Sequence, residues 1–324
     1  MSDTSFKDMI KKSRPNIKDS SIKMYEANLN KLKKLFDTDT WTFLNKPEDV
    51  VDKLSSLSSN TRRNYYNSII ILLMALNSEG KWDEPLEEYN KLRDAGNKEY
   101  QDQSSQISDK QSKNFVEIEE IYKMIETMGN ELKSRNIKKA TDLSSKDKAL
   151  LQVYVIYNIL VRIPLRNDLS GMDAISKRSY NKLSEDDKKA QNFMVVEKSK
   201  ISMILNLYKT SAKYSENIIV VPKDLEKLLR MYIRINGMGE MFKSSTGKPL
   251  SRNAISQLLL KTSDKYMGKK ISTTMLRKIY LSSKYGDLKK EMAADAKMMG
   301  HSVATQQKVY VKDGQTTEGS DDKS

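Results

Sequence analysis

Apolar residues in the first hundred positions recur with the period of an α-helix. The clearest set follows steps of three and four residues: Ile22, Tyr25, Leu29, Leu32 and Phe36. This spacing places apolar side chains on one face of a helix. A short helix is predicted at residues 50–57 after Pro47, and a longer one at 60–77 that opens with Arg62 and Arg63. The N-terminal part is therefore expected to be a helical domain.

The composition changes between residues 96 and 113, where polar side chains dominate and core residues are few. Such a segment is typical of a linker. We therefore expect a first domain at residues 1–95 and a second at residues 114–311. Residues 312–324 are polar and acidic and are expected to be disordered.

The second domain is predicted to combine helices with a small sheet. Helical periodicity is found at about residues 115–128, 146–161, 224–235, 251–267, 273–285, 288–299 and 305–310. Short apolar segments predict strands at residues 193–196, 201–208 and 217–221, with a polar hairpin loop before the last. The expected fold is mainly α, with a small three-stranded antiparallel sheet in an α-rich second domain.

The net charge indicates a polyanionic partner. Among 324 residues there are 57 Lys and Arg against 43 Asp and Glu, a net charge of +14. Basic proteins bind nucleic acid by releasing its counterions. Double-stranded DNA is the first expectation and an anionic membrane the second. A lysine-rich proteome is the plain alternative, which charge alone does not separate from the other two.

Two residue types are nearly missing, and this excludes several kinds of chemistry. The chain has no cysteine and one histidine, which excludes disulfides, thiolate catalysis, and cysteine- or histidine-rich metal sites. No cofactor is expected. No apolar run approaches the ~18 residues of a membrane span, and no secretory signal is visible. We expect a soluble intracellular protein, in cytoplasm or nucleus or with viral or mobile-element DNA, without membrane or small-molecule partner.

Five residues of the second domain form a set suited to metal-free phosphodiester transfer. In chain order they are Arg166, Lys209, Arg277, His301 and Tyr310. A tyrosine phenolate attacks phosphorus and conserves the bond energy in a phosphotyrosine. Two guanidinium groups match the charge that develops on the phosphoryl oxygens. A lysine on a hairpin protonates the leaving 5′ oxygen, and histidine donates to the phosphoryl oxygens or helps to deprotonate the tyrosine.

Each of these residues also has a structural interpretation. For Arg277, which lies between Leu276 and Ile279, it is pairing with a buried acid. His301 is a candidate helix-terminal residue, Arg166 a cation that stabilises a helix C-terminus, and Tyr310 one of 16 tyrosines. A solvated turn is an alternative role for Lys209, and Lys213 is its rival on the same loop. The sequence by itself leaves these alternatives open.

The motifs around these residues resemble those of the tyrosine recombinases of the phage-integrase family. Pro164-Leu165-Arg166 and Leu276-Arg277-Lys278 stand where the family has its two catalytic arginines. The segment from Gly300-His301-Ser302 to Tyr310 matches the family's closing motif in composition and spacing. In the first domain, residues 21–25 and 59–65 resemble the family's helical core-binding domain. The resemblance covers nearly the whole chain, and the closing motif is its most specific part.

The resemblance implies a site-specific recombinase or integrase that cleaves and rejoins DNA through a 3′-phosphotyrosine at Tyr310. It also implies a homotetramer on two DNA sites and no metal. Arg62, Arg63 and Lys278 are the expected DNA contacts. A topoisomerase of type IB and a catalytically inactive DNA-binding relative are the alternatives.

Two positions depart from the family's pattern. Thr274 stands where the family usually has a histidine, three residues before the second arginine. A threonine donates a hydrogen bond but is no base near neutral pH. Asp168 is expected to be the acidic residue that follows the first arginine, at an unusual offset. Both are expected to assist the five principal residues.

Overall fold

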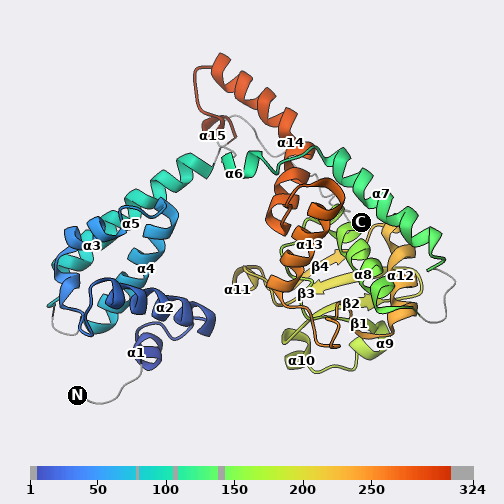
Figure 1. Ribbon diagram of the computed structural model, residues 1–324, viewed down its shortest axis with the longest axis horizontal. Coiled ribbons are helices and arrows are strands. Elements are labelled where there is room, and N and C mark those ends of the chain that lie inside the picture. The colour runs from blue at the N-terminus through green and yellow to red at the C-terminus, as the bar shows by residue number, and fades with distance from the viewer. Residues whose placement is uncertain (1–5, 78–79, 105–108, 138–142, 308–324) are drawn as a thin grey trace, which may run out of the picture. The chain divides into compact units, whose positions relative to one another are not determined.

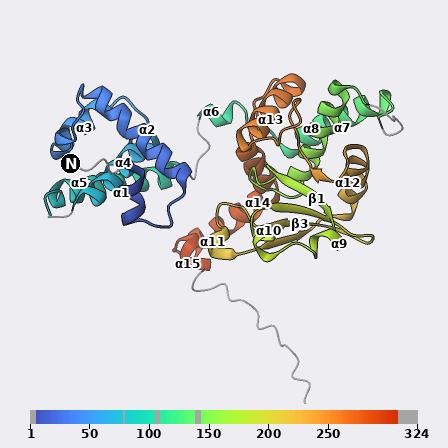
Figure 2. The same cartoon turned by 90° about the horizontal axis from the view of Figure 1, so that it is seen from below.

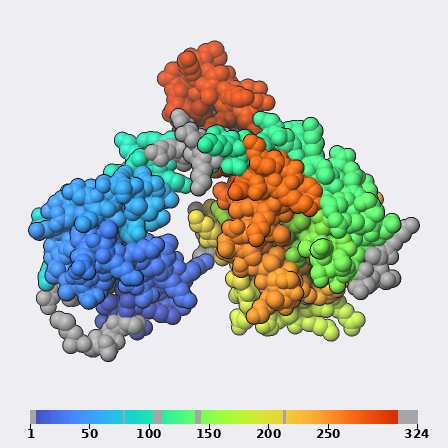
Figure 3. Space-filling model, viewed as in Figure 1, coloured from blue at the N-terminus to red at the C-terminus, as the bar shows by residue number. Residues whose placement is uncertain are grey.

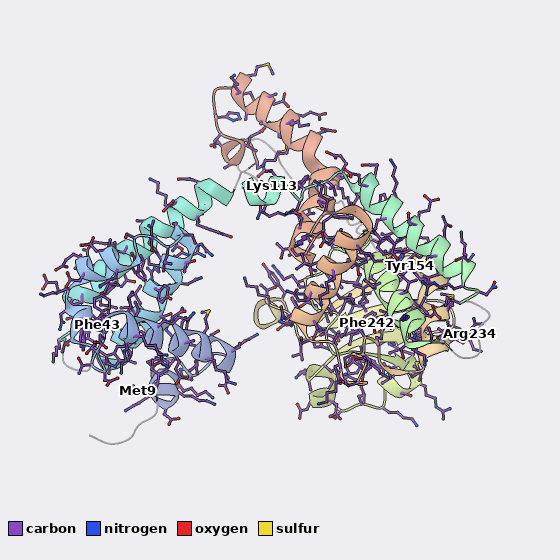
Figure 4. The ribbon with its side chains drawn as sticks, viewed as in Figure 1. Met9, Phe43, Lys113, Tyr154, Arg234 and Phe242 are labelled. Carbon is purple, nitrogen blue, oxygen red and sulfur yellow. The ribbon has the colours of Figure 1, made fainter. Side chains whose placement is uncertain are left out.

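The chain folds in the computed structural model as two compact units, residues 1–109 and 110–324. The structure describes residues 6–77, 80–104, 109–137 and 143–307. Each unit has a hydrophobic core of its own, and the two cores share no residue. Figure 4 labels Phe43, which packs against the core of the first unit, and Phe242, which is fully buried in the second.

The first unit is helical among its described residues. Its elements are α1 (Phe6–Ser13), α2 (Asp19–Leu35), the 3-10 helix η1 (Thr42–Asn45), α3 (Pro47–Leu54), α4 (Ser59–Leu76) and α5 (Asp83–Ser104). Helix α4 lies at the centre, where Ile69, Leu72 and Leu73 are fully buried. The Ser58 hydroxyl caps the start of α4 by accepting a hydrogen bond from the Thr61 amide. Both α2 and α5 pack against this helix (Figure 1).

Helix α5 extends past the domain boundary that the composition suggested at residue 95. The helix continues to Ser104, through part of the segment expected to be a linker. Contacts with α4 explain this continuation, because the Arg63 guanidinium lies over the Tyr100 ring at 4.4 Å and donates to Asn97. Tertiary contacts of this kind leave no signal in composition, so polar residues on α5 resembled a linker.

The second unit surrounds a small sheet with helices (Figures 1 and 2). Its helices are α6 (Asp109–Ser112), α7 (Ile118–Ser134), α8 (Ser145–Leu160), α9 (Lys177–Tyr180), α10 (Glu185–Lys189), α11 (Ser211–Tyr214), α12 (Lys223–Asn236), α13 (Arg252–Met267), α14 (Thr273–Met298) and α15 (Val303–Thr305). Its strands are β1 (Met172–Ser176), β2 (Asn192–Val196), β3 (Ile201–Leu205), β4 (Asn217–Val220) and β5 (Gly239–Glu240). The protein is therefore mainly helical, as predicted.

The sheet has five strands in the order β4-β3-β2-β1-β5, so the prediction of three strands was wrong. The predicted antiparallel pairs are present, with Met194 opposite Met203 and Met203 opposite Ile219. Strand β1 was missed; it runs parallel to β2. Parallel strands need a crossover, which here contains α9 and α10. Strand β5 has two residues, too few for a periodic signal.

Helix α8 is the centre of the second core. From Leu150 onward its residues are apolar almost all round, which is typical of a helix segment buried on every side, and Val155, Ile156 and Ile159 are fully buried. The Tyr157 hydroxyl donates to the Leu259 carbonyl of α13 at 2.8 Å. This bond ties α8 to the helix that precedes α14. No helix within the described ranges is long and apolar enough to cross a membrane.

Helix α14 joins two helices that the sequence predicted separately. We expected breaks between residues 285 and 288, but one helix runs from Thr273 to Met298 through Gly286. A glycine costs a helix only about 1 kcal/mol relative to alanine, so one glycine does not end it. The C-terminal half of α14, residues 286–298, is its outer half. It extends away from α13 and is largely exposed (Figures 1 and 3). This continuity determines where the closing motif lies.

The separation of the two cores predicts separate responses to core mutations. Leu72→Ala should lower the free energy of unfolding of the first unit by about 2–5 kcal/mol, because it removes buried methyl groups and leaves a cavity. Leu229→Ala, equally buried, is the matched change in the second unit. Hydrogen exchange read by segment measures both. Equal loss of protection in both units after either change would contradict separate cores.

Candidate active site

The loop after α8 presents Arg166 between two buried anchors. Helix α8 ends before Pro164, which cannot continue it. Leu165 and Leu169 are buried, whereas Arg166 is exposed. Asp168, two residues on, is buried to 5% exposure. Alternating burial thus fixes the backbone of the loop while it leaves the Arg166 guanidinium at the surface of a cavity.

Arg277 reaches the same cavity from the second turn of α14. Ser272 begins this helix as a side-chain cap that accepts a hydrogen bond from the Met275 amide. The Arg277 Nε donates to the Pro164 carbonyl at 3.0 Å, which ties α14 to the Arg166 loop. Burial lowers the pKa of the Arg277 guanidinium from its usual value, and the neighbouring charge of Arg166 lowers it further.

A polar network holds the two arginine-bearing segments together. The buried Thr273, at the start of α14, donates from its hydroxyl to Asn167 Oδ1 at 2.5 Å. Asn167 Nδ2 donates in turn to the Arg252 carbonyl at 2.8 Å and to the Ser256 hydroxyl at 2.9 Å. Because Asn167 adjoins Arg166, this network fixes the start of α14 against the Arg166 loop.

Both arginines line one cavity of about 440 Å³. Its lining also includes residues of the loop between β3 and β4 and of β4 itself: Tyr208, Thr210, Tyr214, Glu216 and Asn217. Asp168 lines the cavity as well. Two like charges at one partly desolvated cavity repel each other, and an anion bound between them relieves the repulsion. The cavity is therefore suited to bind a phosphate group.

Asp168 places a carboxyl group beside the cavity, and its burial disfavours the charged form of that group. Its carboxylate forms an ion pair with Arg252 at 3.5 Å. Burial raises the pKa of Asp168 from its usual value, against the opposing effects of Arg252 and Arg166. Asp168 therefore lies two residues after Arg166, as predicted from the sequence order, and its carboxylate forms its ion pair with Arg252.

The two candidate lysines lie on the loop between β3 and β4. Lys209 is exposed and stands between Tyr208 and Thr210, which line the cavity. The cavity lining does not include Lys209 itself. Lys213 belongs to α11, and its side chain lies outside the described residues. The structure thus brings the backbone of Lys209 to the edge of the cavity.

The Gly-His-Ser motif has a structural role at the end of α14. Gly300 adopts a left-handed conformation with φ of 72°, which favours glycine. The amides of Gly300 and His301 close the helix by donating to the carbonyls of Lys297 and Ala296. Ser302 then caps α15 by accepting from the Thr305 amide. Backbone geometry alone therefore accounts for the glycine and the serine.

The structure does not bring His301 to the two arginines. His301 follows the end of α14, and the helix extends about 30 Å between Arg277 and Met298 at 1.5 Å per residue. The cavity lining does not include His301. Its Nδ1 lies 3.2 Å from the Ser302 carbonyl oxygen. Tyr310, the predicted nucleophile, lies outside the described residues.

Thr274 and Lys278 are not among the residues that line the cavity, and Arg62 and Arg63 belong to the first unit. Thr274 is exposed on the first turn of α14, and the adjacent Thr273 makes the buried contacts. Lys278 donates to Gln111 at 2.9 Å. In the first unit, Arg62 donates to the Ser55 carbonyl and Arg63 to Asn60.

Sequence reasoning missed the residues that support the arginines. Asn167 adjoins Arg166, so its position offered a local signal. Thr273, Ser256 and Arg252 offered none, because hydrogen bonds and ion pairs that span more than 80 residues depend on the tertiary fold. Among the described residues, no group of three or more His, Asp or Glu side chains forms a potential metal site.

The raised pKa of Asp168 predicts a dependence of stability on pH. The folded state holds this proton more tightly than the unfolded state, so the free energy of unfolding falls as pH rises from the unfolded pKa through the folded one. Asp168→Asn removes this loss. The stability of Asp168→Asn relative to the unaltered chain should therefore increase over that range and then become constant.

Denaturant unfolding from about pH 3 to pH 7 measures this difference. Asp186→Asn, at an exposed position of α10, is the control for loss of a carboxylate. If Asp168→Asn instead becomes relatively less stable as pH rises, attraction by the arginines outweighs the cost of burial.

Comparison with known proteins supports the fold. No protein-family model matches the chain, and no curated protein matches it. Among solved structures, the chain is similar to the XerH site-specific recombinase bound to difH substrate in a pre-cleavage complex. The TM-score is 0.50 at 14% identity, over 95% of this chain and 81% of that one. The XerA recombinase is also similar, with a TM-score of 0.34 at 12% identity, over 93% and 91% of the two chains.

The identities are low, and the TM-score of XerA is too low to support a conclusion. The XerH comparison establishes the fold alone. The chain therefore has the fold of a site-specific recombinase, the family that its motifs resemble.

Proposed function

We propose that the protein is a site-specific DNA recombinase that cleaves and rejoins strands through a 3′-phosphotyrosine at Tyr310. One observation supports this most strongly: Arg166 and Arg277, 111 residues apart in the sequence, line one cavity in a fold similar to that of XerH. The XerH recombinase is bound to its difH substrate in that structure. The net charge of +14 favours the same partner for this chain.

The proposed reaction is an in-line displacement at one phosphodiester. The Tyr310 phenolate oxygen attacks phosphorus, a new P–O bond forms, and the bond to the 5′ oxygen breaks. Arg166 and Arg277 bind the two nonbridging oxygens, where negative charge develops. The ammonium group of Lys209 gives its proton to the leaving 5′ oxygen. Attack by a 5′ hydroxyl on the phosphotyrosine reverses these steps and rejoins a strand.

His301 has to move for this reaction. In the proposed active state it donates to a nonbridging oxygen, but in the structure it follows the far end of α14. The active state therefore requires that the outer half of α14 bend or that another copy of the chain supply His301. A homotetramer on two DNA sites, as the family resemblance implies, provides both DNA and neighbouring copies at the time of cleavage.

A covalent trap tests the nucleophile. The probe is a pool of randomised duplexes, each nicked so that cleavage releases a short fragment and prevents rejoining. The unaltered chain should form a protein–DNA adduct that survives denaturation, and Tyr310→Phe should form none. Tyr285→Phe is the matched control, because Tyr285 is exposed on α14. Tight DNA binding without any adduct would indicate an inactive DNA-binding relative.

The same adduct assay tests Arg277. Arg277→Ala should slow adduct formation by about 10²–10³-fold, because a fixed donor to the transition state is lost. DNA binding and its dependence on salt should change little, since a single phosphate contact contributes little of the total charge neutralised. Arg230→Ala, on α12, is the arginine control. Equal loss of binding and cleavage for Arg277→Ala would make its role structural.

Relaxation of plasmids without strand exchange would favour a type IB topoisomerase.

A further inference from the structure

Asn192 is a buried polar residue that connects the Arg166 loop with the Lys209 loop. It is the first residue of β2 and is only 3% exposed. Its Nδ2 donates to the Asp168 carbonyl at 2.9 Å and to the Leu207 carbonyl at 3.2 Å. Its Oδ1 accepts from the amides of Asn206 and Leu207 at 2.8 and 2.7 Å. All four hydrogen-bonding positions of the amide are therefore occupied.

These partners determine which end of the amide faces which segment. Oδ1 faces two N–H donors and Nδ2 faces two carbonyl acceptors, so the reversed orientation would place like groups together. Three of the four bonds go to residues 206 and 207, directly after β3 ends at Leu205. The fourth goes to Asp168, two residues from Arg166.

Hydrogen bonds hold Asn206 and Leu207, the two residues that follow β3, and Tyr208 then packs against the core. The Leu207 side chain is 47% exposed, so it does not anchor the loop in the core. The Leu207 carbonyl accepts a second bond from Arg252 at 3.2 Å. The Asn206 side chain donates to the carbonyls of Lys188 and Gln191 at 2.8 and 3.0 Å. Lys209 follows two residues after Leu207.

We propose that Asn192 is a positioning residue that aligns Lys209 with the phosphate held by Arg166 and Arg277. The inference rests on the proposed function, in which Lys209 is the general acid. A lysine on an exposed loop has many rotamers, and proton transfer needs its nitrogen within hydrogen-bond reach of the leaving oxygen. By fixing the backbone two residues before Lys209 to the backbone of the arginine loop, Asn192 limits the distance between acid and substrate.

The leaving group makes this role measurable. When the 5′ bridging oxygen is replaced by sulfur, the P–S bond breaks and a thiolate leaves. A thiol has a pKa of about 8.5 and needs no proton from the protein to leave near neutral pH. Loss or displacement of the general acid should therefore slow cleavage of the oxygen substrate but not of the sulfur substrate. A general loss of folding or of DNA binding slows both.

The experiment compares adduct formation by the full chain on matched duplexes with 5′ oxygen or 5′ sulfur. Lys209→Ala should be slowed at least 10²-fold on oxygen and restored to within about threefold of the unaltered chain on sulfur. Asn192→Asp keeps the size and the acceptor but removes both donors, and it places a carboxylate against two carbonyls. It should show the same selective loss, about 10- to 10²-fold on oxygen. Asn158→Asp is the control, a buried asparagine on α8.

Equal slowing of Asn192→Asp on both substrates, or none on either, overturns the inference. So does a Lys209→Ala variant that is not rescued by sulfur, because Asn192 would then have no acid to position. If Asn192→Asp does not fold, Asn206→Asp tests the same loop, with selective loss on oxygen expected and equal loss contradicting it. Absence of an adduct from the unaltered chain on both substrates marks failure of the proposed function itself.

Discussion

Arg166 and Arg277 carry like charges yet line one cavity, and much of the second unit's polar structure serves to hold them there. The carboxylate of Asp168 partly offsets their repulsion, and hydrogen bonds hold the two segments in place against the remainder. The Pro164 carbonyl binds the Arg277 guanidinium, and the hydroxyl of Thr273 ties α14 to the Arg166 loop. Preorganised charges of this kind stabilise a developing phosphoryl charge without rearranging during the reaction.

The sheet contributes to this arrangement from its ends. Strand β1 follows the Arg166 loop, β2 begins with Asn192, and β3 leads into the Lys209 loop. Strands β1 and β2 are parallel, and β3 is antiparallel to β2. The start of β1, the start of β2 and the end of β3 therefore lie at the same end of the sheet. The directions of these strands thus bring the Arg166 loop, Asn192 and the Lys209 loop to the same end of the sheet.

In the closing motif, the glycine and the serine have backbone roles, and the histidine between them does not. Gly300 ends α14 and Ser302 begins α15, so both are explained by backbone geometry. His301, between them, is the residue of the motif whose side chain is capable of acid–base chemistry. It follows α14, which extends about 30 Å from Arg277 to Met298. An uninterrupted α14 thus separates the only imidazole of the chain from the arginine cavity.

The sequence alone determined the elements whose signals are local. Apolar periodicity located the main helices, Pro164 the end of α8, and the motifs around Arg166 and Arg277 the two arginines that share the cavity. Strand β1 and the helical extension of α5 were not predicted, because each depends on contacts between distant segments. The unbroken α14 was not predicted because Gly286 suggested the end of a helix that it only weakens. A single glycine in α14 and a polar stretch in α5 are compatible with more than one local structure.

Only the tertiary structure decided which polar residues act together. Asn192, Thr273 and Arg252 look like ordinary polar residues in the sequence. The fold buries Asn192 and Thr273 against other segments of the chain, and it brings the exposed Arg252 to the buried carboxylate of Asp168. A side chain's type and its neighbours in sequence set what chemistry it is capable of. Its burial and its partners, which depend on the packing of the whole unit, determine whether that chemistry is directed at one cavity.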